Sequence, residues 1–255
     1  MKLARLLQLL LGFLLTQSAL QAAEPLSYYE LRTYTAHEGK LEALHSRFRD
    51  HTMAIFERHG MTNIAYWVPQ QNDANQLVYL LGYPSREARN EAWKGFRGDP
   101  AWQAAYKAST ANGKLVKKVD SVFLKTTDFS PQIKIGKQNI ARVFELRTYT
   151  ASPGNLENLN ARFRDHTVEL FDKHGMTNYA YFNLADGQDG TENMLVYLLA
   201  HKSRASAKTS FRAFGQDPKW RAARKASEEN AGGGLTIRGG VKSVFLNVTD
   251  YSPTN

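Results

Sequence analysis

Three residues able to bind or orient a ligand alternate along the predicted strand 28–34. Glu30, Arg32 and Tyr34 are two residues apart, and because side chains alternate along a strand, all three lie on one face of it. A carboxylate and a guanidinium are costly to bury unless they are paired. The pair therefore either stabilises the fold or forms the polar floor of a cavity that orients an anionic or carbonyl ligand.

The same trio returns 115 residues later in the chain. A polar floor in each copy would place a carboxylate, a guanidinium and a phenol around a bound molecule. This interpretation gives a set of six predicted ligand-binding residues: Glu30, Arg32, Tyr34, Glu145, Arg147 and Tyr149.

His51 and its counterpart His166 are the candidate catalytic residues. His51 lies in the middle of the predicted helix 40–59, about 60° from the centre of the apolar stripe and beside Phe48 and Ile55. There it would face a cavity between helix and sheet and act as a general acid or base, or as a haem ligand. A hydrogen-bonded histidine at the border of the core is the alternative interpretation.

A second pair of histidines, His59 and His174, has a predicted structural role. Both lie at a helix end, where the macrodipole favours an imidazolium. His51 and His59 are eight residues apart, about 12 Å along a helix, so they do not share a metal ion. The chain contains no cysteine, which excludes a thiol nucleophile and an iron–sulfur cluster. We predict no metal and no cofactor, with haem as the one open alternative.

The chain is a tandem duplication. Residues 29–67 and 144–182 align without a gap and share 25 of 39 positions. After a hairpin insertion the offset rises from 115 to 118, and in the last strand it is 122. The second helix diverges most, because 86–96 and 204–214 keep only one Arg and one Phe. The first strand and first helix are therefore the constrained parts of the unit, either by a site or by packing between the copies.

Each copy has the pattern of a ferredoxin-like β-α-β-β-α-β unit. Periodicity and turn signals predict strands and helices, with Asp99 as the N-cap of a short third helix and Gly60 ending the first helix. The third strand is apolar on both faces, so the other copy must cover the face that the helices leave free. We predict an α+β fold in which the two units pack as an intramolecular pseudo-dimer of the α/β-barrel type. Dimerisation between chains is the rival arrangement. The elements expected in the first copy are 28–34, 40–59, 62–68, 76–83, 85–96, 99–109 and 116–125.

The first residues have the three parts of a secretory signal peptide. Lys2 and Arg5 precede a short apolar run, and small residues follow before Glu24. We expect cleavage after Ala22 or Ala23, with an uncleaved anchor as the alternative, and no stable membrane span after cleavage. The predicted divisions of the chain are a signal peptide at 1–22, units at 26–131 and 140–253, and a linker at 132–139.

The charge balance restricts the partners. The chain carries 33 Lys and Arg against 24 Asp and Glu, a surplus that attracts anionic surfaces or substrates. Because export across the inner membrane would place the protein in the periplasm, nucleic acid is not an expected partner.

The motifs together resemble the NIPSNAP family. They are Glu-Leu-Arg-Thr-Tyr on the first strand, Phe-Arg-Asp-His-Thr on the first helix, His-Gly-Met after it, and Asp-Pro-x-Trp later, and all occur in both copies. The resemblance implies a fold of the dimeric α/β-barrel superfamily. That superfamily includes cofactor-independent monooxygenases, haem-degrading and haem-peroxidase enzymes, isomerases and binding modules, so the fold alone does not give a function.

Two functional hypotheses follow. In the first, the exported protein binds a small organic molecule in a cavity between helices and sheet, as a cofactor-independent monooxygenase or isomerase. In the second, it is a non-catalytic interaction module of the cell envelope that uses a surface patch. A cavity with converging polar side chains favours the first hypothesis.

Overall fold

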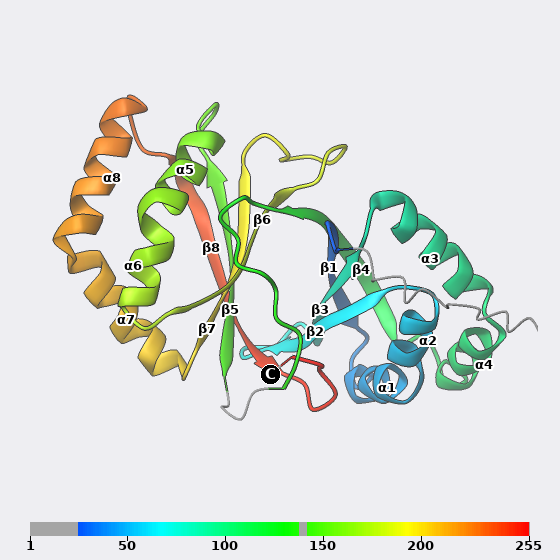
Figure 1. The fold of residues 1–255 in the computed structure, drawn as a ribbon. Coiled ribbons are helices and arrows are strands. Elements are labelled where there is room, and N and C mark those ends of the chain that lie inside the picture. The colour runs from blue at the N-terminus through cyan, green and yellow to red at the C-terminus, as the bar shows by residue number, and fades with distance from the viewer. Residues whose placement is uncertain (1–24, 138–141, 255) are drawn as a thin grey trace, which may run out of the picture.

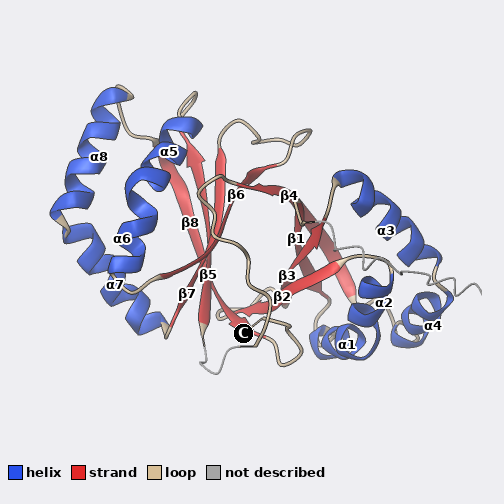
Figure 2. Ribbon diagram, viewed as in Figure 1, coloured by secondary structure: helices blue, strands red, loops and turns tan. Residues whose placement is uncertain are grey.

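The computed structural model describes residues 25–137 and 142–254. The predicted signal peptide and part of the predicted linker lie outside these ranges. Two layers of helices flank a central body of strands (Figures 1 and 2). Each layer belongs to one copy of the duplicated sequence, so the two copies are called the first unit (β1 to β4) and the second unit (β5 to β8).

Both units have the predicted element order, with the second crossover split into two helices. The first unit consists of β1 (Tyr28–Ala36), α1 (Leu41–Arg47), the π-helix η1 (Phe48–Thr52), α2 (Met53–Arg58), β2 (Thr62–Pro69), β3 (Gln76–Tyr83), α3 (Arg86–Gly98), α4 (Pro100–Ser109) and β4 (Val116–Thr126). The second unit consists of β5 (Val143–Ala151), α5 (Leu156–Arg162), the π-helix η2 (Phe163–Thr167), α6 (Val168–Lys173), β6 (Thr177–Leu184), β7 (Met194–His201), α7 (Arg204–Gln216), α8 (Pro218–Asn230) and β8 (Thr236–Val248).

The eight strands close into one barrel in the order β1-β3-β2-β8-β5-β7-β6-β4. Two short antiparallel contacts join the units: β2 pairs with β8 around Val68 and Asn247, and β4 pairs with β6 around Lys125 and Asn183. The predicted pseudo-dimer is therefore confirmed. Because a single chain closes the barrel, closure does not require a second chain.

The faces of the strands that point into the barrel are packed by apolar side chains from both units. Trp67 lies 5.5 Å from Phe144, and Tyr29 lies 5.3 Å from Phe182, measured between ring centroids. Each of these pairs joins one unit to the other. Burial of apolar surface between the units is thus the main force that holds them together, as expected for two small halves without a disulfide.

The C-terminal segment of each unit packs on the helices of the other. Asp250, after β8, forms a bidentate ion pair with Arg49 of η1, with both N–O distances 3.0 Å. Asp128, after β4, forms the same pair with Arg164 of η2. The neighbouring Tyr251 lies against the core of the first unit, so the units exchange their C-terminal segments. Phe129 does the same in the second unit.

The first helix of each unit contains a π-helical turn, which the periodicity did not predict. In this wider turn Phe48 and Thr52 both point inward and are buried, while the three residues between them are exposed. The Thr52 hydroxyl donates to the carbonyl oxygen of Arg47 at 3.1 Å. The prediction that His51 faces a cavity between helix and sheet is therefore wrong, because the extra residue in the turn rotates it to the outside.

The predicted helix ends are confirmed. Asp99 caps α4, where its side chain accepts from the N–H of Ala101 at 2.8 Å, and Gly60 has a positive φ of 79°. His59 lies 2.8 Å from the Asp99 carboxylate, and His174 makes the same contact with Asp217. These two histidines therefore link a helix end to a helix start, in agreement with a structural role.

Across the part of the chain that the structure describes, none of the helices has the length and apolar character needed to cross a membrane.

Candidate functional site

A hollow of about 710 Å³ opens between α7 and the sheet of the second unit. Its size is in the range of small-molecule sites. Aromatic rings and aliphatic stems form most of its surface, and two of the predicted ligand-binding residues lie at its inner end. It is called the second-unit hollow and is lined by Glu145, Arg147, Arg204, Ala205, Lys208, Phe211 and Phe245.

The inner end of the hollow is an ionic cluster on β5 and β7. Arg147 donates to Glu145 at 2.5 Å, to Tyr197 at 2.9 Å and to Tyr149 at 3.1 Å. Nε2 of His201 lies 3.1 Å from the second carboxylate oxygen of Glu145. Nδ1 of His201 is buried and has no hydrogen-bond partner among the described residues.

The cluster keeps Glu145 ionised. Burial by itself raises the pKa of the Glu145 carboxyl, but the hydrogen bond with His201 and the charge of Arg147 outweigh it, and the pKa is lowered. Phe211 covers the guanidinium of Arg147, 4.6 Å from the ring centroid, which shields the ion pair from water. The floor of the hollow is thus a fixed, charged arrangement that a ligand does not have to organise.

The same place in the first unit is filled. Arg89 on α3 donates to both oxygens of Glu30 at 2.9 Å, and the indole N–H of Trp93 donates to the same carboxylate at 3.0 Å. Arg32 pairs with Glu30 as well. Burial raises the pKa of Glu30, but the hydrogen bond from Arg89 and the charge of Arg32 lower it further than burial raises it. In this unit Glu30, Arg32 and Tyr34 are bound to one another and to α3 by hydrogen bonds and ion pairs, which indicates a structural role.

Replacements between α3 and α7 explain the difference between the units. At the offset of 118, Ala207 stands where the first unit has Arg89, and Phe211 stands where it has Trp93. Both changes shorten the side chain and remove donors from the carboxylate. Among the described residues, no side chain of α7 therefore hydrogen-bonds to Glu145. The guanidinium of Arg204 lies 5.2 Å from the Phe245 ring, as that of Arg89 lies 5.0 Å from the Phe123 ring in the first unit.

Two further replacements place smaller side chains beside the residues that line the hollow. Val143 corresponds to Tyr28, whose ring stacks on Phe123 with centroids 5.9 Å apart. His201 corresponds to Tyr83, a larger side chain, which in the first unit accepts from Trp93 at 3.0 Å. All four replacements act in the same direction, so the second-unit hollow results from a consistent set of changes.

The hairpin loop between β6 and β7 of the second unit packs on the first unit. This loop carries three extra residues, and its Asp186 carbonyl oxygen accepts from Arg86 at the start of α3. Gln188 donates to the carbonyl oxygen of Phe123 at 2.5 Å and accepts from its N–H at 3.2 Å. The loop between β2 and β3 of the first unit is shorter. The backbone N–H of its Gln70 donates to the carbonyl oxygen of Phe245 at 2.8 Å, and Phe245 still lines the hollow.

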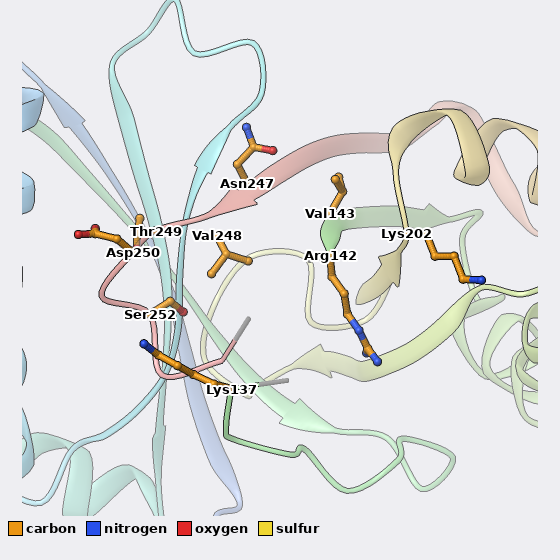
Figure 3. Close-up of a pocket in the computed structure, with 9 residues that line it drawn as sticks. All are labelled: Lys137, Arg142, Val143, Lys202, Asn247, Val248, Thr249, Asp250 and Ser252. Carbon is orange, nitrogen blue, oxygen red and sulfur yellow. The ribbon is translucent and has the colours of Figure 1, made fainter. Parts of the chain in front are cut away.

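Another hollow, of about 430 Å³, lies where the segment before β5 passes the end of β8 (Figure 3). Its charged side chains do not converge on one point, because Lys202 and Asp250 lie on opposite sides of the view. Asp250 is already paired with Arg49. This arrangement gives no common binding point for a ligand.

The candidate catalytic histidines lie away from the second-unit hollow. His51 and His166 are both exposed, and His166 borders a separate hollow of about 200 Å³ between α5 and α8. Both imidazoles are exposed, which does not fit a buried haem ligand. The described residues also contain no group of three or more His, Asp or Glu side chains that could hold a metal ion.

Sequence reasoning missed His201, Ala207 and Phe211. Their signal was present in the comparison of the two copies, because each differs from its counterpart while the ionic pair at the floor is unchanged. The divergence of the second helix was interpreted as weak constraint. The structure shows instead that this divergence separates a filled unit from an open one.

These features define a barrel protein of two fused ferredoxin-like units, with a hollow of small-molecule size beneath one helical layer. The NIPSNAP family model matches residues 29–131 and 144–253. The chain belongs to the NIPSNAP family, which confirms the resemblance carried by its motifs.

Similar proteins agree with this placement. A NipSnap homologue of Dictyostelium discoideum is 28% identical over 132 residues, which is 50% of this chain and 51% of that protein. The match thus spans about half the length of this curated relative. A solved structure from Lactobacillus acidophilus described as a "putative monooxygenase" has a TM-score of 0.55 at 9% identity, covering 88% of this chain and 94% of the other. A structure described as an anthrone oxidase-like protein has a TM-score of 0.56 at 11% identity, covering 89% and 92%. At these identities the two structures establish the fold.

Proposed function

We propose that the protein binds a small organic molecule in the second-unit hollow. The observation that carries this proposal is the contrast between the units. Arg89 and Trp93 hold the Glu30 carboxylate in the first unit, while Ala207 and Phe211 give Glu145 no such donors in the second, where Glu145 lines a hollow of about 710 Å³. Residues that only stabilise the fold would have no reason to lose their packing partners in one copy. The ion pair of Glu145 is retained, which keeps a polar floor beneath apolar walls.

The test closes the hollow with the residues of the first unit. In the variant Ala207→Arg/Phe211→Trp, the new side chains would reach Glu145 as their counterparts reach Glu30. The matched control is Thr209→Arg, which adds the same charge to an exposed position of α7 outside the hollow.

The probes are 2-naphthoate, 2-naphthylmethanol and 2-naphthylmethylammonium, followed by saturation-transfer NMR and calorimetry. We expect saturable binding of one molecule per chain for at least one probe. That binding disappears in the closed variant and persists in the control. Absence of binding, or binding that the closed variant retains, would overturn the proposal and favour the interaction module of the envelope.

We further propose proton transfer by the Glu145–His201 pair. Glu145 lines the hollow, and His201 is buried next to it, with its ring 6.1 Å from Phe211 and 6.2 Å from Phe245. With its hydrogen on Nε2 toward Glu145, His201 carries a lone pair on Nδ1, the buried nitrogen without a partner among the described residues. An imidazole oriented by a carboxylate is suited to remove a proton from a carbon acid. An isomerase returns that proton to another carbon, whereas a cofactor-independent monooxygenase passes the electrons to dioxygen.

Anthrone is a suitable probe for this second part, because its central CH2 group is acidic and its rings are apolar. Oxidation to anthraquinone consumes one dioxygen; one oxygen atom enters the ring carbonyl and the other leaves as water with the two hydrogens. We expect accelerated oxygen uptake that His201→Phe abolishes and Thr209→Arg does not. If oxygen uptake stays at the uncatalysed rate, the proposed catalysis is wrong, while the proposed binding still stands.

We also propose that the protein acts in the periplasm. Support comes from the basic start, short apolar run and small residues of 1–22. N-terminal sequencing of the protein from a periplasmic fraction is expected to begin at Ala23 or Glu24. An intact Met1 in that fraction would contradict cleavage.

A further inference from the structure

We infer that the second-unit hollow selects organic anions. A carboxylate or a similar group would lie between Arg204 and Lys208 at the mouth, and a flat apolar body would lie against Phe211 and Phe245. This inference rests on the proposed binding function and adds the chemical class of the ligand.

The charges that line the hollow are unbalanced. Arg147, Arg204 and Lys208 are positive, and Glu145 is the one acidic residue of the lining. Glu145 is already neutralised by Arg147 and hydrogen-bonded by His201. Among the described residues, neither Arg204 nor Lys208 forms an ion pair with a carboxylate. Two positive charges at the mouth therefore lack a counter-charge, which an anionic ligand would supply.

The two cations lie on the same side of the helix. Arg204 and Lys208 are four residues apart on α7, and residues at this spacing are neighbours on a helix surface. Both are exposed, so they are accessible to a ligand that enters the mouth. Their long stems add aliphatic surface to the walls of the hollow.

The first unit shows that this charge is specific to the open site. Its helix α3 carries Glu87 and Glu91, whereas α7 has Ala205 and Thr209 at these positions and contains no acidic residue. Lys208 replaces a neutral Asn90. The helix that borders the open hollow has thus lost its acids and gained a cation at the mouth. In the first unit, the corresponding positions of α3 hold both a cation, Arg86, and an acid, Glu87.

The walls determine the shape of the ligand body. Phe211 and Phe245 lie on opposite elements, α7 and β8, and each ring centroid is about 6 Å from the ring of His201 (6.1 and 6.2 Å). The guanidinium of Arg204 lies 5.2 Å from the Phe245 ring. Aromatic rings pack favourably on flat apolar groups, so an aryl carboxylate fits both the walls and the mouth.

The test measures dissociation constants for the three naphthalene probes, which share one body and differ in charge. We expect 2-naphthoate to bind about fivefold more tightly than 2-naphthylmethanol at low salt, which is the upper end of what one exposed ion pair supplies. 2-Naphthylmethylammonium is expected to bind weakest. Added salt should reduce the preference for the anion, because both cations are exposed.

Variants assign the preference to the mouth. Arg204→Gln/Lys208→Gln is expected to abolish the preference while 2-naphthylmethanol still binds. Ala205→Glu, which restores an acid of the first unit, should also weaken 2-naphthoate. The control Arg212→Gln removes a charge from α7 outside the hollow and should leave the preference intact. Equal affinities for the three probes, or tighter binding of the ammonium, would overturn the inference and leave the binding function standing. Failure of all three to bind would overturn the binding function itself.

Discussion

Glu30 and Glu145 occupy the same position in the two units, so their replacement by glutamine forms a matched pair of perturbations. We expect Glu30→Gln to lower the free energy of unfolding by about 3–5 kcal/mol, the usual cost of breaking a buried ion pair. We expect Glu145→Gln to cost less, about 3 kcal/mol, because it breaks one buried ion pair where Glu30→Gln breaks two. The difference follows from the number of groups that each carboxylate holds.

Glu30 is fully buried and forms ion pairs with two guanidinium groups, Arg32 and Arg89, besides accepting from Trp93. A glutamine would present its amide N–H2 to some of these donors and leave both guanidinium groups without a counter-charge. The Arg89 side chain is 19% exposed, which screens part of the loss. Glu145 forms an ion pair with one guanidinium, Arg147, and its second partner is the imidazole of His201.

The assay is urea denaturation followed by circular dichroism, at neutral pH and across the acid range. The pKa of each carboxyl is lowered in the folded protein, so its contribution is complete above the unfolded value of about 4.3 and is lost as the pH falls. The stability curves of the wild type and Glu30→Gln should therefore converge toward acid. Equal losses in the two variants at neutral pH, or a larger loss in Glu145→Gln, would refute the assignment of structural and binding roles.

Two further predictions concern the first unit. Tyr251→Ala is expected to lower the free energy of unfolding by about 2–4 kcal/mol and to increase hydrogen exchange in α1 and β2 of the first unit, because Tyr251 packs against His45 and Tyr66. Faster exchange confined to the second unit would contradict the exchange of segments. Trp93→Phe is expected to cost about 1–3 kcal/mol, because the indole N–H lies 3.0 Å from both Glu30 and the Tyr83 hydroxyl; unchanged urea midpoints would count against the filled site.

Much of the fold follows from local sequence signals. The 115-residue repeat predicts two similar units, and the doubly apolar third strand predicts that each sheet covers the other. The N-cap at Asp99 and the left-handed Gly60 were predicted because these positions depend on neighbouring residues alone. The packing of the two units as a pseudo-dimer could be predicted because the helices of a ferredoxin-like unit leave only one face of its sheet free.

The parts that the sequence did not predict depend on distant contacts. The π-helical turn shifts the helix face by one residue, which moved His51 from the expected cavity to the surface. The packing of Tyr251 and Asp250 on the first unit could not be predicted from local sequence, because it depends on how the two units face each other. The hollow itself depends on several side-chain replacements in α7 and the neighbouring strands, which the periodicity of a helix does not reveal.

The central claim is that the second unit binds an organic anion and the first unit does not. A crystal structure of the protein with 2-naphthoate tests it most directly. We predict one molecule per chain, with its rings between Phe211 and Phe245 and its carboxylate between Arg204 and Lys208, and none beside Trp93 in the first unit. A naphthoate bound beneath α3, or bound only outside both helical layers, would contradict the claim.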